Sequence, residues 1–234
     1  MSEPLRIAVA GLGTVGGGVV RALAERSDDL ASRAGREILL SQVCALDREK
    51  RRMHDMAELK WAHSALDLAQ SDADVVVELI GGENGTALNL IWAALNNGKH
   101  VVTANKSLLA RHGADLAELA EKKGVALKFE AAVAGGIPIV KALRESLVAH
   151  GVGAVRGILN GTCNFILTQM EATGRSFHEV LAEAQRMGFA EADPSLDVGG
   201  HDTAHKLALL ASLAFGIRPS LQQMTIEGIA KVTP

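Results

Sequence analysis

The feature that most constrains the fold is an apolar run that leads directly into a glycine-rich turn near the N-terminus. Residues 5–10 are apolar apart from Arg6 and show no alternation, which is typical of a strand covered on both faces in a parallel sheet. The next six residues, GLGTVG, fit the pattern G-x-G-x-x-G, and residues 17–25 can continue as a helix. This order predicts a dinucleotide-binding unit in which amides at the helix N-terminus hold a pyrophosphate. A turn that serves only helix–strand contact is the alternative. The candidate cofactor-binding residues here are Gly11, Gly13, Thr14, Val15 and Gly16.

The region after the second expected strand bears on the choice of cofactor. We expect a loop at residues 28–36 and a strand at residues 38–46, ending at Asp47. A carboxylate there can accept from the ribose hydroxyls of NAD, whereas nearby cations favour the 2′-phosphate of NADP. A basic cluster follows, consisting of Arg48, Lys50, Arg51 and Arg52. A solvated charged loop is the alternative; we expect a preference for NADP, with NAD possible, and take Arg48 as the candidate contact.

Strand and helix patterns then alternate as far as residue 129. The expected strands lie at residues 75–80, 100–102 and 125–129, and the expected helices at residues 84–97 and 114–123. Five or six strands alternating with helices predict a doubly wound parallel sheet of the Rossmann type. Thr103, Asn105 and Lys106 come directly after one of these strands, at the end where ligands bind in such folds.

A second stretch, residues 188–206, carries many ionisable groups within hydrophobic sequence. They are Glu191, Asp193, Asp197, Asp202 and Lys206. Asp202 and Lys206 are four apart and precede the apolar run 207–215, so they should share one face near the start of a buried helix. A capped and solvated first turn, with Lys206 as the partner of Asp202, is the alternative to a functional cleft.

The sequence of this stretch, GFAEADPSLDVGGHDTAHKL, resembles the substrate-site signature of the homoserine dehydrogenases. Similar family motifs are T-x-N-K at residues 103–106, E-x-x-V-x-G-G-I-P at residues 130–138 and N-G-T-x-N-F-I-L at residues 160–167. The motifs span residues 7 to 206. The resemblance implies reversible oxidation of L-homoserine to L-aspartate 4-semialdehyde with a nicotinamide cofactor.

The resemblance and the chemistry together assign candidate roles. Oxidising a primary alcohol removes a hydride from carbon and a proton from oxygen, and Lys206 is our choice to stabilise the developing charge on that oxygen. Asp202 would orient it, and Lys106 is implied to reach the cleft between cofactor and substrate. Glu191 is implied to bind the substrate ammonium, with Asp197 as a helper. Asn160, Gly161 and Thr162 are expected to line the substrate pocket, and Thr103 and Lys106 to contact the cofactor.

The segment around residue 130 is implied by the resemblance to hold a structural monovalent cation, expected to be sodium. The implied ligands are Glu130, Val133, Gly135 and Ile137. Backbone oxygens leave almost no residue pattern, so a tight hinge between domains stays the alternative. Cys163 is expected to pack rather than act as a nucleophile, because no histidine partner is evident.

We expect two domains, a dinucleotide-binding domain at residues 1–134 and an α+β substrate-binding and dimerisation domain at residues 135–234. The second should contain strands at residues 152–159, where apolar and polar residues alternate, and at residues 224–232. Ser176 and Glu179 fit a capping box at the start of a helix. A homodimer is expected.

Charge and cysteine usage narrow the partners. The net charge is −3 and basic residues are dispersed, which predicts neither nucleic-acid nor membrane binding and favours a small-molecule substrate. Cys44 and Cys163 show no CxxC spacing, and neither a signal peptide nor a long apolar span is evident. A cytoplasmic location is expected.

Family members continue well beyond the equivalent of residue 234, so we expect either a short natural form or a fragment with an open cleft and poor turnover. Two other functions stay open. One is a related Rossmann oxidoreductase acting on another small hydroxy acid or aldehyde. The other is a non-catalytic nucleotide-binding module.

Overall fold

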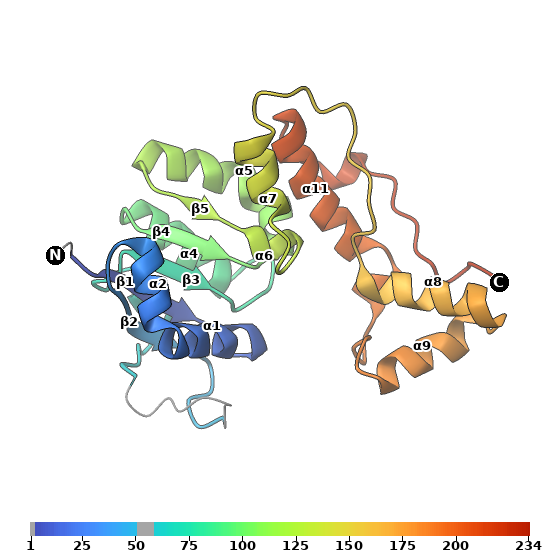
Figure 1. The fold of residues 1–234 in the computed structure, drawn as a ribbon, viewed down its shortest axis with the longest axis horizontal. Helices are drawn as coiled ribbons and strands as arrows, with labels where there is room; N and C mark the ends of the chain where they lie inside the picture. Colours follow the sequence, from blue (N-terminus) through green and yellow to red (C-terminus); the bar gives the residue numbers. More distant parts are fainter. Residues whose placement is uncertain (1–2, 51–58) are drawn as a thin grey trace. The chain divides into compact units, whose positions relative to one another are not determined.

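The chain divides into two compact units, residues 1–135 and 136–234, and each is described here by itself (Figure 1). The computed structural model describes residues 3–50 and 59–234. The expected domain boundary, after residue 134, lies one residue from this division.

The first unit is built on a five-stranded parallel sheet with the order β2-β1-β3-β4-β5. The strands are β1 (Leu5–Ala10), β2 (Ile38–Cys44), β3 (Val75–Glu78), β4 (His100–Thr103) and β5 (Leu127–Lys128). The chain moves outward from β1 to β2 and then, from β3 on, in the opposite direction. This reversal between β1 and β3 is the topological switch point at which doubly wound sheets bind ligands. The predicted doubly wound parallel sheet is confirmed.

Helices cover both faces of this sheet. They are α1 (Thr14–Glu25), α2 (Ser27–Ala34), α3 (Ala65–Leu68), α4 (Thr86–Asn96), α5 (Lys106–Lys123) and α6 (Glu130–Val133). Crossovers between parallel strands are right-handed, so the reversal of direction puts α1 on one face and α4 and α5 on the other (Figure 1).

The apolar runs read from the sequence form the centre of this unit. Residues Ala8 to Ala10 of β1 and Val76 of β3 are fully buried, because helices lie on both sides of these strands. Val9 packs with Leu12, Val20 and Val43 in one cluster that joins the sheet to α1. Burial on both faces explains why the strands lack alternation.

The expected loop at residues 28–36 is wrong, since most of it lies in α2. This helix is short and buries none of its residues, so its few apolar side chains give too weak a pattern to be recognised in the sequence. Asp29 pairs with Arg26 and, at 2.8 Å, with Arg33, and these charge pairs along one face stabilise an exposed helix.

The helix expected at residues 114–123 begins earlier, at Lys106. The side chain of Asn105 accepts a hydrogen bond from the amide of Leu108 at 3.2 Å and thereby caps α5. The segment read from the sequence as the end of a strand is therefore a strand end followed at once by a helix start. Lys106 occupies the first helical position.

All of the regular secondary structure in the second unit, residues 136–234, is helical. It contains α7 (Ile139–Lys141), a π-helical turn η1 (Ala142–Ser146), α8 (Gly161–Thr173), α9 (Phe177–Arg186), α10 (Ser195–Val198), α11 (His201–Phe215) and a 3-10 turn η2 (Leu221–Gln223). The capping box of Ser176 and Glu179 at the start of α9 is confirmed. Ile166 and Met170 of α8 pack against Val180 of α9 in the core. Within the described residues, no helix is long and apolar enough to cross a membrane.

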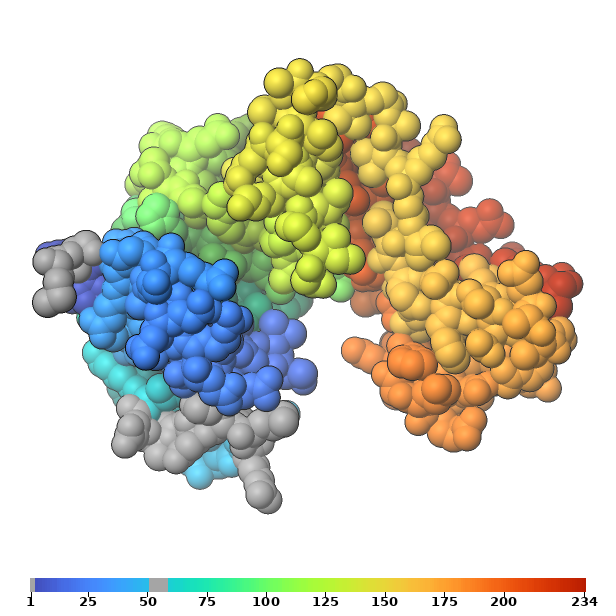
Figure 2. All heavy atoms as spheres, viewed as in Figure 1, coloured from blue at the N-terminus to red at the C-terminus, as the bar shows by residue number. Residues whose placement is uncertain are grey.

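The strands expected at residues 152–159 and 224–232 are absent, so the second unit is helical rather than α+β over residues 136–234. A strand needs a neighbouring strand to take up its backbone hydrogen bonds, and no segment of this unit supplies one. Residues 151–160 instead form an extended connection in which Ile158 is 77% exposed. Figure 2 shows this segment, in yellow, at the molecular surface.

Candidate active site

The glycine-rich turn joins β1 to α1, and two of its glycines are required by close contacts. Gly11 has a φ of +92°, and a Cβ built on it would lie 2.3 Å from the carbonyl oxygen of Leu79. A Cβ on Gly16 would lie 1.8 Å from the carbonyl oxygen of Gly11. Any side chain at either position would force backbone apart, so these glycines hold the turn against β3 and α1.

Gly13 differs from its neighbours, because a Cβ there would meet no atom within 4 Å. Gly13 is the N-cap of α1, and no side chain caps the amides of the first turn. Thr14 and Val15, the next residues, are exposed. Open space beside uncapped helix amides suits a phosphate group, so this glycine favours nucleotide binding over a turn that serves only helix–strand contact.

A cavity of about 740 Å³ opens beside this turn, at the carboxyl ends of the strands. Its lining includes residues 11–13, residues 44–47, Lys50, residues 63–65, Leu79, Ile80 and Thr86. The carboxylate of Asp47 accepts from the amides of Glu49 and Lys50 at 2.9 and 3.1 Å, and so shapes the turn after β2. His63 and Ser64 were missed from the sequence, because the segment that carries them resembles no motif.

The basic cluster after β2 is only partly brought to this cavity. Lys50 lines it, whereas Arg48 is not among the lining residues. The guanidinium of Arg48 lies over the ring of Trp61, 5.5 Å from its centroid, and donates to the carbonyl oxygen of Ala62 at 2.6 Å. Arg51 and Arg52 lie outside the described residues.

Thr103, expected to contact the cofactor, is buried at the end of β4 with 1% of its surface exposed. Its hydroxyl donates to the carboxylate of Glu78 at 2.5 Å and accepts from the amide of Asn105 at 3.0 Å. Glu78 was missed from the sequence, because a single acid at the end of an apolar run carries no pattern. Lys106 is half-buried at the start of α5.

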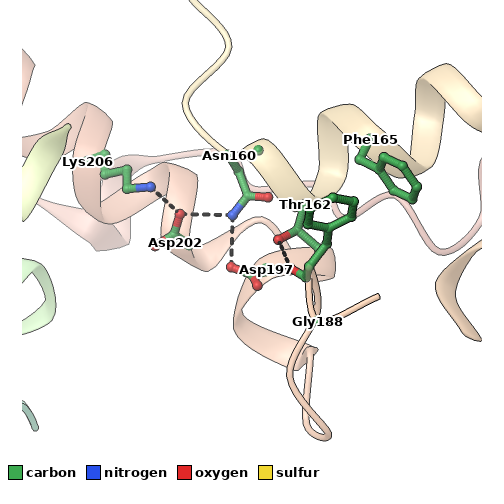
Figure 3. Close-up of a pocket in the computed structure, with 9 residues that line it drawn as sticks. Asn160, Thr162, Phe165, Gly188, Asp197, Asp202 and Lys206 are labelled. Carbon is green, nitrogen blue, oxygen red and sulfur yellow. Dashed lines mark hydrogen bonds and ion pairs between the residues drawn. The ribbon is translucent and has the colours of Figure 1, made fainter. Parts of the chain in front are cut away.

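The second unit contains a separate cavity of about 570 Å³ (Figure 3). It is lined by Asn160, Gly161, Thr162, Phe165, Gly188, Phe189, Asp197, Asp202 and Lys206. Six of the residues singled out in the sequence, far apart along the chain, therefore meet here.

A continuous line of hydrogen bonds runs along this cavity. The ammonium of Lys206 pairs with the carboxylate of Asp202 at 2.7 Å. The side-chain amide of Asn160 donates to Asp202 at 2.9 Å and to Asp197 at 2.8 Å (Figure 3). One amide group thus joins two carboxylates, each of which sits on a different helix.

Lys206 is held by two fixed acceptors. Besides Asp202 it donates to the carbonyl oxygen of Leu159 at 2.9 Å, and its side chain is 19% exposed. An ammonium group has three donors, so these contacts leave one N–H for a ligand in the cavity. A desolvated and oriented cation of this kind can stabilise negative charge on a bound oxygen.

The start of α8 forms one wall. The carbonyl of the Asn160 side chain accepts from the amide of Cys163 at 2.8 Å and so caps the helix. The hydroxyl of Thr162 donates to the carbonyl oxygen of Phe189 at 2.8 Å. The rings of Phe165 and Phe189 lie 4.9 Å apart, centroid to centroid, and were missed from the sequence although both lie within the family motifs.

Cys163 is poorly suited to act as a nucleophile. Burial raises the pKa of its thiol, and the carboxylates of Asp197 and Asp202 raise the pKa further. Its sulfur donates a hydrogen bond to the carbonyl oxygen of Asp197 at 3.2 Å. A raised pKa lowers the thiolate fraction at neutral pH, and the thiolate is the reactive form.

Glu191 and the implied cation ligands are not among the residues that line the two cavities described above. Glu191 is exposed between α9 and α10 and is not among the residues that line the cavity of its unit. Of the implied cation ligands, Glu130 and Val133 lie in α6, Gly135 ends the first unit and Ile137 is 62% exposed. Across the described residues, no cluster of three or more histidine, cysteine or carboxylate side chains could hold a metal ion.

The first unit has a doubly wound sheet and a glycine turn whose helix amides no side chain caps. The second unit is helical and has a cavity lined by a lysine and carboxylates. Together they define a class of protein with a dinucleotide-binding unit and a second ligand-binding unit. Residues 11–130 match the family model described as homoserine dehydrogenase, NAD binding domain, and residues 138–234 match the model described as homoserine dehydrogenase. The chain belongs to the homoserine dehydrogenase family.

Individual relatives agree with this assignment. A homoserine dehydrogenase of Pseudomonas aeruginosa is 49% identical over 99% of this chain and 53% of its own length. The crystal structure of one from Thiobacillus denitrificans has a TM-score of 0.92 at 44% identity, covering 99% of this chain and 53% of that one. A hyperthermophilic archaeal homoserine dehydrogenase, solved in complex with NADPH, has a TM-score of 0.84 at 26% identity, covering 98% and 75%. The chain spans about half the length of the curated relatives it matches.

Proposed function

We propose that this chain supplies the nucleotide-binding and substrate-binding units of a homoserine dehydrogenase, which interconverts L-homoserine and L-aspartate 4-semialdehyde with NAD(P). The observation that carries the proposal is the line of hydrogen bonds from Lys206 through Asp202 and Asn160 to Asp197 along one cavity. Cationic and anionic groups held at fixed distances match a small substrate that carries a hydroxyl and an ammonium group.

The proposed chemistry centres on Lys206. A bound nicotinamide cofactor would supply the acceptor for the hydride that leaves the substrate carbon. In the reductive direction, the remaining N–H of Lys206 donates to the aldehyde oxygen, stabilises the negative charge that develops there as the carbon receives the hydride, and passes its proton to that oxygen. Oxidation of the alcohol reverses this transfer, so that the amine of Lys206 accepts the hydroxyl proton. Asp202 and the carbonyl of Leu159 keep the ammonium in place, so Asp202 orients rather than exchanges protons. We propose Lys106, at the start of α5, as a second catalytic lysine.

Substrate selection is proposed to depend on carboxylates and on the start of α8. Asp197 lines the cavity and can pair with the substrate ammonium by a charge-assisted hydrogen bond. Glu191 is proposed for the same group on the resemblance alone. Asn160, Gly161 and Thr162 would shape the pocket around the rest of the substrate.

For the cofactor we propose NADP, with NAD as the poorer alternative. Lys50 in the nucleotide cavity and the NADPH bound by the archaeal relative support this choice. Glu130, Val133, Gly135 and Ile137 are proposed to offer carboxylate and backbone oxygens to sodium, donors that suit a hard cation, in a structural role. A homodimer in the cytoplasm completes the proposal.

The experiment is a substrate panel run on the longest natural form of the protein. Reduction of NADP⁺ would be followed with homoserine, with serine and with 4-hydroxybutanoate, which lacks the ammonium group. We expect homoserine to be oxidised best, because only it presents both groups at the required separation. Better turnover of another hydroxy acid would favour a related oxidoreductase. Nucleotide binding without any turnover would favour a non-catalytic module.

A further inference from the structure

A buried acid that the reaction does not use lies at the end of β3. Glu78 is fully buried, and both of its carboxylate oxygens accept hydrogen bonds. One oxygen accepts from the amides of Ile80 and Gly81 at 2.8 and 3.1 Å, and the other accepts from the hydroxyl of Thr103 at 2.5 Å. Burying a carboxylate is costly, so three donors aimed at one side chain indicate a built arrangement.

The hydrogen bonds around Glu78 close into a ring. The hydroxyl of Thr103 accepts from the amide of Asn105 at 3.0 Å. The side chain of Asn105 then donates to the carbonyl oxygen of Gly82 at 2.7 Å, which returns to the loop that Glu78 holds. The ends of β3 and β4 and the intervening glycine loop are thereby fixed to one another.

The ring of hydrogen bonds borders two other parts of the same unit, the nucleotide cavity and the start of α5. Leu79 and Ile80 line the nucleotide cavity, and the backbone of Gly11 lies directly against Leu79. On the other side, Asn105 caps α5, whose first residue is Lys106. A shift in the ring would therefore displace a wall of the cavity and the start of α5 together.

We propose that Glu78 is a positioning residue that sets the nucleotide cavity and the start of α5 through this ring. The proposal rests on the proposed function, since it assigns to that cavity a nicotinamide dinucleotide. A carboxylate suits the task because it only accepts hydrogen bonds, whereas a glutamine would turn an NH₂ group toward one of the donors. Glu78 itself is fully buried and is not among the residues that line the nucleotide cavity.

The test compares variants that break the ring with one that keeps it. Thr103→Val removes the hydroxyl between Glu78 and Asn105 with little change in shape, Thr103→Ser retains a hydroxyl, and Glu78→Gln replaces one acceptor oxygen by a donor. Ser41→Ala is the matched control, because it removes a hydroxyl hydrogen bond to Ile7 in the same sheet but outside the ring. The dissociation constant of NADPH and the melting temperature would be measured for each.

We expect Thr103→Val and Glu78→Gln each to weaken NADPH binding about tenfold, as expected for a lost buried hydrogen bond near a ligand. Thr103→Ser should recover most of that loss, and Ser41→Ala should lower the melting temperature without weakening binding. A merely structural role would reduce the number of binding sites but not the affinity of the folded fraction. Wild-type affinity in folded Thr103→Val, or no recovery in Thr103→Ser, would overturn the proposal. Wild-type protein that binds no nicotinamide dinucleotide would instead contradict the proposed function.

Discussion

The nucleotide end of the first unit and the cavity of the second unit are built from different parts of the chain. Around Gly11, Gly13 and Gly16 the groups offered to the proposed nucleotide are backbone amides, and at Gly11 and Gly16 a side chain is excluded because backbone lies against backbone. Along the other cavity the groups are side chains, with Lys206 and Asp202 at its centre. The first region should therefore be sensitive to added volume, and the second to lost charge or hydrogen-bonding capacity.

The largest effect is expected from adding one methyl group to the glycine turn. Gly16→Ala places a Cβ 1.8 Å from the carbonyl oxygen of Gly11, and the backbone there cannot move without displacing β3. We expect the first unit to lose about 3 kcal/mol of stability. Gly13→Ala is the matched control, since its Cβ meets nothing, and it should keep the melting temperature while weakening nucleotide binding. Equal melting temperatures for both variants would contradict the claim that the glycine turn is sensitive to added volume.

The next effect concerns the amide that joins two carboxylates. Asn160→Asp keeps the N-cap of α8 but turns a shared donor into a third carboxylate beside Asp197 and Asp202. We expect a loss of roughly 2 kcal/mol and a raised KM for homoserine. Asn160→Ser also keeps the cap, lacks the added charge and should lose less. A melting temperature for Asn160→Asp equal to that of Asn160→Ser would contradict an electrostatic origin.

A smaller effect, on cofactor affinity, is expected from the basic side chains after β2, which are charged groups near the nucleotide cavity. Arg48→Ala combined with Lys50→Ala should weaken NADP⁺ binding about tenfold more than NAD⁺ binding, because only NADP⁺ carries the 2′-phosphate. Titration of both cofactors would measure this ratio. Arg33→Ala, in the exposed helix α2, is the control and should leave it unchanged. An equal loss for both cofactors would mean that the cluster is merely a charged surface.

The smallest effect is a pH dependence at Cys163. Its pKa is raised by burial and by the two neighbouring carboxylates, so the thiol stays protonated at neutral pH and ionises only as the pH rises. Alkylation by iodoacetamide should therefore be slow at neutral pH and accelerate above the ordinary thiol range. Asp197→Asn removes one of the carboxylates and should move that acceleration to lower pH. Fast alkylation at neutral pH would contradict this environment.

The two regions also differ in how well the sequence predicted them. Unbroken apolar runs and the spacing of Gly11, Gly13 and Gly16 were enough to predict the doubly wound parallel sheet, because burial on both faces leaves a strong local pattern. Helix α2 was missed because it buries nothing. The strands expected at residues 152–159 and 224–232 were wrong, since alternation describes one strand and says nothing about whether a neighbour exists to pair with it.

For the site, charge spacing predicted the pair of Asp202 and Lys206, because residues four apart on a helix are neighbours. The same reasoning could not place Asn160 between Asp197 and Asp202, which depends on how α8, α10 and α11 meet. The role of Glu78 could not be predicted for a similar reason, since its hydrogen-bond partners come from the next strand and from a loop. Contacts across elements carry no signal in a single sequence.

The proposal that the first unit binds the nucleotide and Lys206 of the second unit acts in catalysis is tested most directly on Lys206→Met in the longest natural form of the protein. Homoserine-dependent reduction of NADP⁺ and the dissociation constant of NADP⁺ would be determined on the same sample. Because Lys206→Met removes the ammonium that pairs with the buried carboxylate of Asp202, the double variant Lys206→Met, Asp202→Asn would be measured beside it, with Lys231→Ala as the surface control. The role proposed for Lys206 predicts a loss of turnover of at least about a hundredfold with nearly unchanged NADP⁺ affinity. Retained turnover, or a parallel loss of nucleotide affinity in the folded double variant, would contradict it.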